Sequence, residues 1–279
     1  MRRCARLVIG VVALLGTAVK AAETNERLRI PDFFDPNLRL PKPETDAVKS
    51  IRFLTTDDYP PFHFALPDGT LAGFDIDLAR AICADLQLAC TIQARRFDTL
   101  VAQVKGGHDD ALIAAVANTS ESHKDLDFTA PYYKTPGRFV VREKTSLAAT
   151  PEALAGHKVG VEANTAHAAY LAAFFPKSDI KAYPNQAALR VALQKGEIDA
   201  MFGDGIALAL WLNGTDAKGC CAFLGGPFTE SRFFGNGVSI AVAKGNIALR
   251  QALDYELSLL AKNGTYTDLY LKYFPIGFY

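Results

Sequence analysis

The chain has 279 residues, of which 49% are hydrophobic and 22% are charged, and its 30 basic and 30 acidic residues give a formal net charge of zero. This composition is typical of a globular protein with enough length for one or two hydrophobic cores. A zero net charge without a basic patch gives no support to nucleic-acid binding or to binding of anionic lipid.

The N-terminus has the pattern of an export signal. Three arginines within the first six residues precede an apolar run at 7–19, and small residues at Val19 and Ala21 flank Lys20. About thirteen apolar residues fall short of the roughly 20 that a membrane-spanning helix needs, which argues against an anchor. We therefore expect a signal peptide at 1–21, cleaved after Ala21, and an exported mature protein.

Residues 22–49 contain four prolines among charged residues. Proline fixes φ and removes a backbone donor, so this stretch predicts an extended arm and not a domain.

From residue 50 onward the chain alternates strand and helix patterns. Phe74, Leu78, Ile82 and Leu86 form one apolar stripe at i+4 steps, which predicts a helix. The expected elements are a strand at 50–55, a turn at 68–69, a helix at 73–88, a strand at 90–94, a helix at 97–105, a buried strand at 110–116, a strand at 158–161, a helix at 165–175, a strand at 180–183, a helix at 186–195, strands at 200–203 and 238–243, and a helix at 248–262. This order predicts an α/β fold built from two similar halves.

The stretch from Gly106 to Tyr133, GGHDDALIAAVANTSESHKDLDFTAPYY, joins a buried strand to a polar turn and to the phrase Asp-Phe-Thr-Ala-Pro-Tyr-Tyr. It resembles the ligand-binding centre of family 3 of the periplasmic solute-binding proteins of ABC importers, the group that takes polar amino acids. The matching residues are Asp110, Ala111, Ile113, Ala114, Thr119, Glu121, Phe128, Thr129, Pro131, Tyr132 and Tyr133. The resemblance covers about residues 50–279.

The resemblance implies a type II periplasmic binding fold, with two lobes that are each a mostly parallel sheet flanked by helices, and a ligand cleft between them. Lobe 1 is expected at 50–134 plus 238–279 and lobe 2 at 138–234. The strands at 137–141 and 235–240 are expected as the hinge crossings. It further implies a monomeric periplasmic protein without a cofactor, whose partners are a small-molecule ligand and an ABC transporter permease.

The cysteines of the mature chain form two close pairs. Cys83 and Cys90 flank a helix-to-strand turn, where the lysine/arginine/ornithine- and histidine-binding members of the family carry a cysteine pair. The resemblance therefore implies a Cys83–Cys90 disulfide, against the alternative of two buried free thiols. Adjacent cysteines rarely bond each other, so the state of Cys220 and Cys221 stays open. No His/Cys cluster has metal-ligand spacing, so we expect no structural zinc.

The family's ligand site maps onto seven positions of this chain. Tyr59 and Phe97 correspond to aromatic residues on the two sides of the ligand, where they can hold an aliphatic stem or a cation. The alternatives are that Tyr59 packs on its own loop and that Phe97 belongs to the core. The full set is Tyr59, Phe97, Ala115, Ala117, Ser122, Thr165 and Asp204.

The other five positions supply polar contacts in the family. Ala115 and Ala117 lie in the segment whose carbonyls and hydroxyls meet the ligand amine, and Asp204 matches the aspartate that pairs with that amine. Thr165 begins a helix whose N–H groups meet the ligand carboxylate. Ser122 stands where the family has an arginine that clamps the carboxylate, and this loss predicts at least tenfold weaker α-carboxylate binding.

Other basic residues are candidates for a relocated anion site, namely Arg96, His123, Lys124 and Arg232. Three functions follow from these expectations. The first is capture of an amino acid or amine for an ABC importer. The second is an accessory or sensor protein with an eroded cleft, associated with a periplasmic quinoprotein dehydrogenase. The third is an enzyme that resembles cyclohexadienyl dehydratases, which the chain supports least because it shows no catalytic residue pattern.

Overall fold

The structure is a computed structural model that describes residues 34, 37, 39–43, 48–108, 110–143 and 145–274. The expected signal peptide at 1–21 lies outside the described residues, and the arm at 22–49 is described only in part. No helix in these described ranges is long and apolar enough to cross a membrane.

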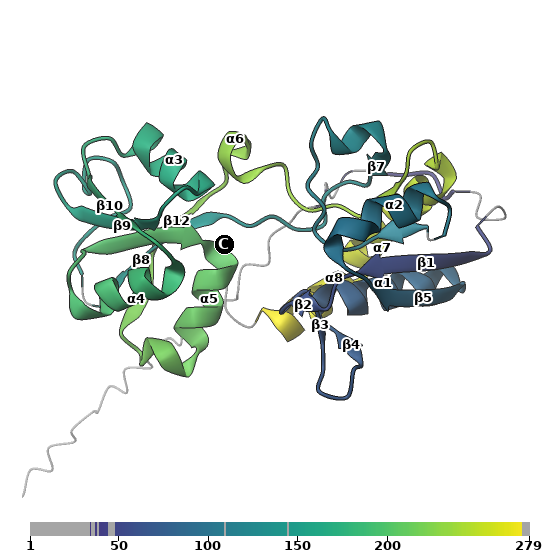
Figure 1. Ribbon diagram of the computed structural model, residues 1–279, viewed down its shortest axis with the longest axis horizontal. Coiled ribbons are helices and arrows are strands. Elements are labelled where there is room, and N and C mark those ends of the chain that lie inside the picture. Colours follow the sequence, from purple (N-terminus) through teal and green to yellow (C-terminus); the bar gives the residue numbers. More distant parts are fainter. Residues whose placement is uncertain are drawn as a thin grey trace, which may run out of the picture.

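The first of two five-stranded sheets has the order β5-β1-β6-β13-β7. β1 (Ser50–Thr55) pairs in parallel with β5 (Ala89–Ala94) and with β6 (Ala111–Leu112). β13 (Ala241–Ala243) returns late in the chain and pairs antiparallel with β6 and with β7 (Leu126–Phe128). We call the part of the molecule around this sheet lobe 1, on the right in Figure 1.

The second sheet has the order β10-β9-β11-β8-β12 and forms lobe 2, on the left in Figure 1. β9 (Lys158–Glu162) pairs in parallel with β10 (Asp179–Tyr183) and β11 (Ala200–Asp204). β8 (Gly137–Arg142) pairs antiparallel with β11 and β12 (Cys221–Phe228). The two-lobed α/β class is confirmed. Each sheet is mostly parallel with one antiparallel strand, β13 in lobe 1 and β8 in lobe 2.

Helices cover both sheets. Those of lobe 1 are α1 (Phe74–Leu86), α2 (Leu100–Lys105), α7 (Ile247–Lys262) and α8 (Thr265–Tyr273), with 3-10 turns η1 (Phe97–Thr99) and η2 (Ser122–Lys124). Those of lobe 2 are α3 (Ala166–Phe174), α4 (Gln186–Lys195), α5 (Gly205–Asn213) and α6 (Ser231–Phe234), with the 3-10 turn η3 (Thr215–Ala217). A small sheet of β2 (Asp58–Tyr59), β3 (His63–Ala65) and β4 (Leu71–Ala72) completes lobe 1.

The connections between the lobes differ from the expected crossings. Residues 137–141, expected as a crossing strand, belong to β8 inside the second sheet. The chain reaches β8 through residues 134–136, and it leaves β12 through α6 and residues 235–240. An isolated bridge between Tyr133 and Val238 holds the two connections side by side. The expected lobe limits remain a prediction.

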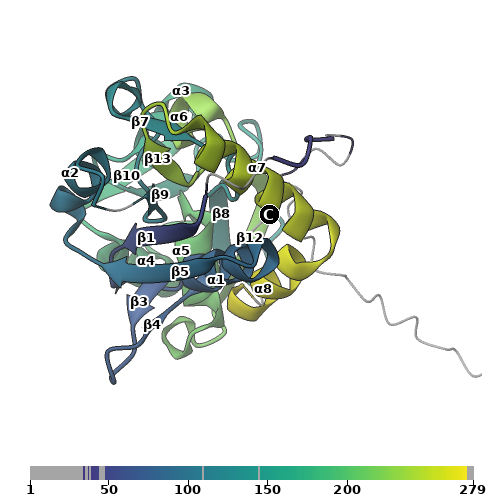
Figure 2. The ribbon, with the colours of Figure 1, turned by 90° about the vertical axis from the view of Figure 1, so that its right-hand side faces the viewer.

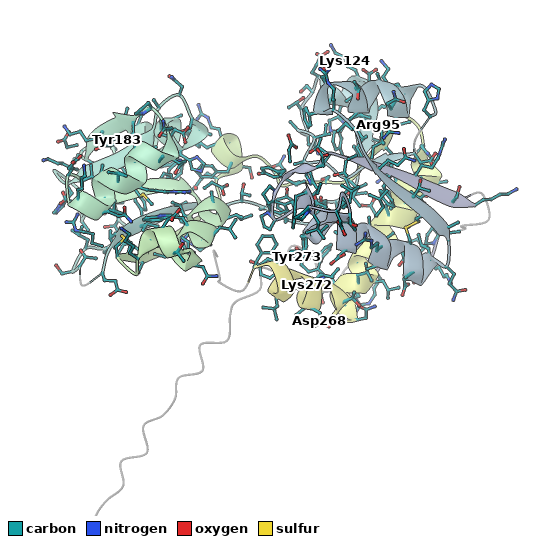
Figure 3. The ribbon with its side chains drawn as sticks, turned by 60° about the horizontal axis from the view of Figure 1, so that its bottom comes forward. Arg95, Lys124, Tyr183, Asp268, Lys272 and Tyr273 are labelled. Carbon is teal, nitrogen blue, oxygen red and sulfur yellow. A yellow bond between two sulfur atoms is a disulfide. The ribbon has the colours of Figure 1, made fainter. Side chains whose placement is uncertain are left out.

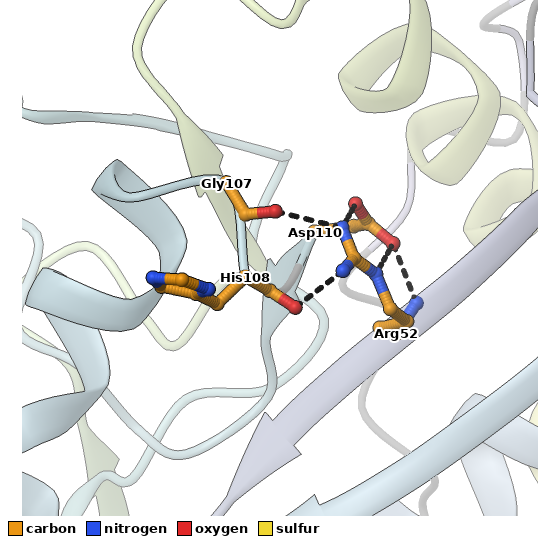
Figure 4. A network of polar contacts seen from close by, with 4 residues as sticks. All are labelled: Arg52, Gly107, His108 and Asp110. Atoms are coloured by element: carbon orange, nitrogen blue, oxygen red, sulfur yellow. Dashed lines mark hydrogen bonds and ion pairs between the residues drawn. The ribbon is translucent and has the colours of Figure 1, made fainter.

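The strand expected at 110–116 is short in the structure. It ends at Leu112, because Ala115 takes a left-handed backbone conformation with φ 52° and turns the chain away from the sheet. Arg52 ties this strand to β1: its Nε and Nη2 donate to Asp110 at 3.0 and 2.8 Å, and its guanidinium also reaches the carbonyls of Gly107 and His108 (Figure 4). Burial alone would raise the pKa of Asp110, but the hydrogen bonds from Arg52 hold that pKa below its ordinary value.

Polar contacts also hold the helices of lobe 1 together. Asp77 on α1 accepts hydrogen bonds at 2.6 Å from both Lys272 and Tyr273 of α8, which Figure 3 labels. Figure 2 shows lobe 1 from the side that faces away from lobe 2, with α7 and α8 beside α1. The closing helices thus return to the first half of the chain, although 195 residues separate Asp77 from Lys272 in sequence.

Two disulfides occur among the described residues. One joins Cys83 at the end of α1 to Cys90 in β5, the pairing that the resemblance implied, with a Cα–Cα distance of 6.1 Å. The other joins the adjacent Cys220 and Cys221, whose state the sequence left open.

Replacing both Cys83 and Cys90 by serine is expected to lower the free energy of unfolding by about 2–3 kcal/mol, because the bond closes a loop of seven residue steps in the unfolded chain. Urea denaturation measures this loss. The matched control replaces Cys220 and Cys221 by serine; bonding adjacent residues constrains the unfolded chain less, so the control should lose less stability. An equal loss in both variants, or a free thiol at Cys83 in freshly isolated protein, would contradict the prediction.

Candidate functional site

A polar cavity lies where the two parallel strands β1 and β5 end. It has a volume of about 600 Å³ and is lined by Thr56, Asp57, Asp58, Ala94, Arg95, Arg96, Phe97 and Asp98. The carboxyl ends of parallel strands are the usual place for ligands in α/β sheets. Phe97 is 58% exposed here, so it is not the core residue of the alternative interpretation.

Tyr59 lies beside this cavity in β2 and is 47% exposed. Its ring stacks on Phe62, with ring centroids 5.4 Å apart, and Phe62 stacks in turn on Tyr133 at 4.5 Å. Gly73 permits this loop to lie against the start of α1, because a Cβ on Gly73 would be 2.2 Å from the carbonyl oxygen of Phe62. Tyr59 therefore packs on its own loop and still presents part of its ring to solvent.

The loop after β6 carries three of the predicted site residues. Ala115 has the left-handed φ of 52°, a conformation that costs a non-glycine residue about 1–3 kcal/mol and that gathers at binding sites. Ala117 is exposed. The hydroxyl of Ser122 donates to the carbonyl of Ala117 at 2.8 Å and accepts from the N–H of Thr119 at 2.9 Å, so it closes the loop from within.

Three of the four candidate cations have partners nearby. Arg96 pairs with Asp98 at 2.7 Å, and Lys124, labelled at the surface of lobe 1 in Figure 3, pairs with Glu121 at 2.6 Å. The ring of His123 contacts Asn118 through Nε2 at 2.7 Å. Arg232 on α6 lies over the ring of Phe233 at 5.8 Å. The structure thus positions none of Arg96, His123 and Lys124 as a free substitute for the missing clamp.

On lobe 2, Thr165 is the N-cap of α3. Its hydroxyl accepts from the N–H of Ala168 at 3.2 Å and donates to the carbonyl of Glu162 at 2.8 Å. The N–H groups of Ala166 and His167 in the first turn have no intrahelical acceptor, as in any helix, and they point out of the helix end. This end can therefore bind a carboxylate weakly without a basic side chain.

Asp204 ends β11 and is also the N-cap of α5. It accepts from the N–H of Ala207 at 2.8 Å, and the N–H of Ile206 and the hydroxyl of Thr135 also hydrogen-bond to it. Burial raises the pKa of Asp204 above its ordinary value, against these hydrogen bonds and the neighbouring His167. A carboxylate has about four acceptor positions, so one remains for a ligand.

His167 is a site residue that sequence reasoning missed. It lies in the first turn of α3 between the rings of Phe202 and Phe234, at centroid distances of 5.6 and 5.1 Å, and its Nε2 is buried without a hydrogen-bond partner. Burial lowers the pKa of His167, although the charges of Asp204 and Glu162 oppose this. His167 follows the N-cap Thr165 by two residues, a position at which the family pattern accepts any residue. The sequence therefore gave little reason to select it.

Electrostatic contacts link the two lobes across this site. Burial raises the pKa values of Tyr59 and Tyr133 on lobe 1, and the charge of Asp204 on lobe 2 raises both further. Tyr59, Tyr133 and His167 thus lie near enough to Asp204 for its charge to shift their pKa values. Within the described part of the chain, Phe97, Ala117 and Ser122 form no hydrogen bond, ion pair or ring contact with Tyr59 or Asp204. A carboxylate can accept hydrogen bonds from an ammonium group, and the faces of neighbouring aromatic rings attract the positive charge of that group.

The described residues hold no cluster of three or more His, Cys, Asp or Glu side chains that could bind a metal ion. Two sheets in separate lobes, joined by two adjacent connections, are the architecture of a two-lobed solute-binding protein.

Comparison with known proteins gives the family. The profile of the bacterial extracellular solute-binding proteins, family 3, matches residues 51–276. The chain belongs to this family. It is 34% identical over 239 residues to the L-arginine-binding protein of Pseudomonas aeruginosa, a match that covers 85% of this chain and 92% of that one.

Solved structures agree with this fold. Substrate-binding domain 2 of Lactococcus lactis GlnP in its open conformation gives a TM-score of 0.71 at 22% identity, over 84% of this chain and 99% of that one. An ancestral arginine-binding protein bound to arginine gives a TM-score of 0.52 at 30% identity, over 81% and 98% of the two chains.

Proposed function

We propose that this protein is a periplasmic solute-binding protein that captures a solute with an amino group, an amino acid or an amine, and delivers it to the permease of an ABC importer. The observation that carries the proposal is the carboxylate of Asp204, whose charge acts on Tyr59 and Tyr133 of the other lobe, with the unpartnered Nε2 of His167 nearby. Cleavage of the signal peptide after Ala21 belongs to the same proposal.

The part of the site that would bind a ligand carboxylate is weaker than the part around Asp204 that would bind a ligand ammonium group. Ser122 closes its own loop, and Arg96 and Lys124 are paired with Asp98 and Glu121. The first turn of α3 still offers donors to a ligand carboxylate, and such a helix end contributes about 0.3–1 kcal/mol where it is exposed. A solute with a cationic group and no α-carboxylate should therefore bind almost as well as the matching amino acid.

L-arginine and its decarboxylated analogue agmatine test this directly, because they differ only in the carboxylate. A ligand that binds the folded state raises the melting temperature by mass action, so a thermal-shift assay with both compounds, lysine, and simple amines would report the class. We expect agmatine and arginine to stabilise the protein to a similar extent. No shift with any amine or amino acid would contradict the proposed function.

Binding should also close the lobes. The structure matches the open domain better than the arginine-bound ancestral protein, despite its lower sequence identity to the former. The connections at 134–136 and 235–240 are the segments that can absorb a hinge motion. Small-angle scattering should show a smaller radius of gyration with saturating ligand, and tight binding at an unchanged radius would contradict the hinge.

A second candidate is supported by the thinned carboxylate site, in which Ser122 replaces the clamp: an accessory protein whose partner is a periplasmic dehydrogenase. This candidate predicts that no small solute shifts the melting temperature, the opposite of the first outcome above. Neither candidate is an enzyme.

A further inference from the structure

A second pocket lies in lobe 1 away from the ligand cleft. Its volume is about 240 Å³, and its lining comes from the N-terminal arm, from the end of α1 and from α7. The lining residues are Lys42, Pro43, Asp85, Leu86, Gln87, Tyr255, Glu256 and Leu259. α1 runs back from the carboxyl end of β1 to the start of β5, so the end of α1 lies at the edge of the sheet opposite the cleft.

Glu256 is the buried one of the two acidic residues that line this pocket. It is 3% exposed, and its Oε2 has no hydrogen-bond partner. The neighbouring acidic group is Asp85, and a side-chain hydrogen bond between two carboxyl groups requires that one of them carries a proton. A buried charge without such a proton or a cation is strongly unfavourable.

The groups around Glu256 determine how it titrates. Burial, together with the hydrogen bond and the charge of Asp85, raises the pKa of Glu256 to about 7, and the ammonium of Lys42 opposes this rise. Tyr255 lines the same pocket from the helix that carries Glu256. Two species can therefore neutralise the acidic pair: a shared proton or the side chain of Lys42.

We propose that Asp85 and Glu256 form a proton-linked docking site for Lys42, through which the N-terminal arm is held on lobe 1. A second contact supports a docked arm: the ring of Phe34 meets that of Tyr266 on α8 edge-on, with centroids 5.2 Å apart. In this proposal the proton acts on the Lys42 contact and not on the contact between these two rings.

The direction of the pH effect follows from linkage. The ordinary pKa of a glutamate in the unfolded chain is near 4.5, and its folded value here is higher, so the ionised form of Glu256 is penalised in the folded state. The stability from this group is present below pH 4.5 and is lost as the pH rises through about 7. Lys42 offsets part of that loss, and it does so only where Glu256 is ionised. Docking of Lys42 is therefore tighter at pH 8 than at pH 5.5.

A double-mutant cycle at two pH values tests the proposal on the exported protein with its arm. Lys42→Gln should lower the melting temperature by about 2 °C at pH 8.0, a typical effect of a contact worth less than a kilocalorie in a protein of this size, and by much less at pH 5.5. Glu256→Gln should raise the melting temperature at pH 8.0 and remove the effect of Lys42→Gln. Lys49→Gln, which removes another exposed charge of the arm, is the matched control and should show no such pH dependence.

A direct titration provides the second measurement. The carbon-13 signal of the Glu256 carboxyl should have a higher pH midpoint in Lys42→Gln than in the unmodified protein, because the cation that lowers its pKa is gone. The proposal is overturned if the midpoint is unchanged, or if Lys42→Gln has the same effect at both pH values or on the Glu256→Gln background.

Discussion

Asp204→Asn is expected to weaken the binding of agmatine and of L-arginine by a factor of about 30 or more, with the fold intact. Losing one partner of a buried, hydrogen-bonded charge pair costs about 2–5 kcal/mol, and each 1.4 kcal/mol is tenfold in affinity. Asparagine is as good an N-cap as aspartate, so the bond to the N–H of Ala207 and the start of α5 should persist. Calorimetric titration measures the affinity, and a melting curve checks the fold.

Asp199→Asn is the matched control for this change. Asp199 precedes the same strand, β11, at its opposite end, where it accepts from the N–H of Lys158 at 2.9 Å. Its replacement should leave the affinity for both compounds unchanged. Asp204 would be a helix cap and nothing more if Asp204→Asn bound both compounds as tightly as the unmodified protein. Because burial raises the pKa of Asp204, amine affinity should also decline as the pH falls toward that raised value.

Ser122→Arg is expected to shift the preference of the site toward α-amino acids. A charge-assisted hydrogen bond contributes about 1.5–3 kcal/mol, so arginine should gain at least about tenfold over agmatine, which has no carboxylate for the new side chain to bind. The variant also loses the hydrogen bonds of the Ser122 hydroxyl to Ala117 and Thr119. We therefore expect a small decrease in melting temperature together with the gain in discrimination.

Ser122→Gln separates these two effects, because it removes the same hydroxyl contacts and adds no charge. The ratio of arginine to agmatine affinity should stay near that of the unmodified protein in Ser122→Gln and rise in Ser122→Arg. An equal ratio in both variants would mean that residue 122 does not face the ligand carboxylate in the closed state.

Local patterns were sufficient for most elements. β1 occupies 50–55 and α4 occupies Gln186–Lys195, as the alternation of apolar residues and the closing Gly196 predict. Helix α5 and strand β12 escaped prediction. α5 is apolar on nearly all sides, because it packs both on lobe 2 and, through Ile206 and Ala209, on the core of lobe 1, and such a segment has no helical stripe to detect.

The candidate site shows the same division. The motif around Asp110 and the strand end at Asp204 indicated the family, because both are short runs of residues whose types and spacing can be read directly from the sequence. The role of Ser122 could not be predicted, since its partners were set by the turn that begins at Ala115. The role of His167 could not be predicted for a similar reason. Its Nε2 has no partner because Phe202 and Phe234, which lie far from it in sequence, pack on either side of the ring.

The sequence by itself determined the α/β class, the family, the position of Asp204 and the Cys83–Cys90 pair, because each depends on residues close in sequence or on a pattern that the chain repeats. The tertiary structure decided which strands share a sheet and which cations are already paired. It also placed Lys42 in one pocket with Asp85, more than 40 residues further along the chain, and with Glu256 on α7. These features depend on contacts between segments that only folding brings together. The burial, the pKa and the unpartnered hydrogen-bonding groups of a side chain all follow from those contacts.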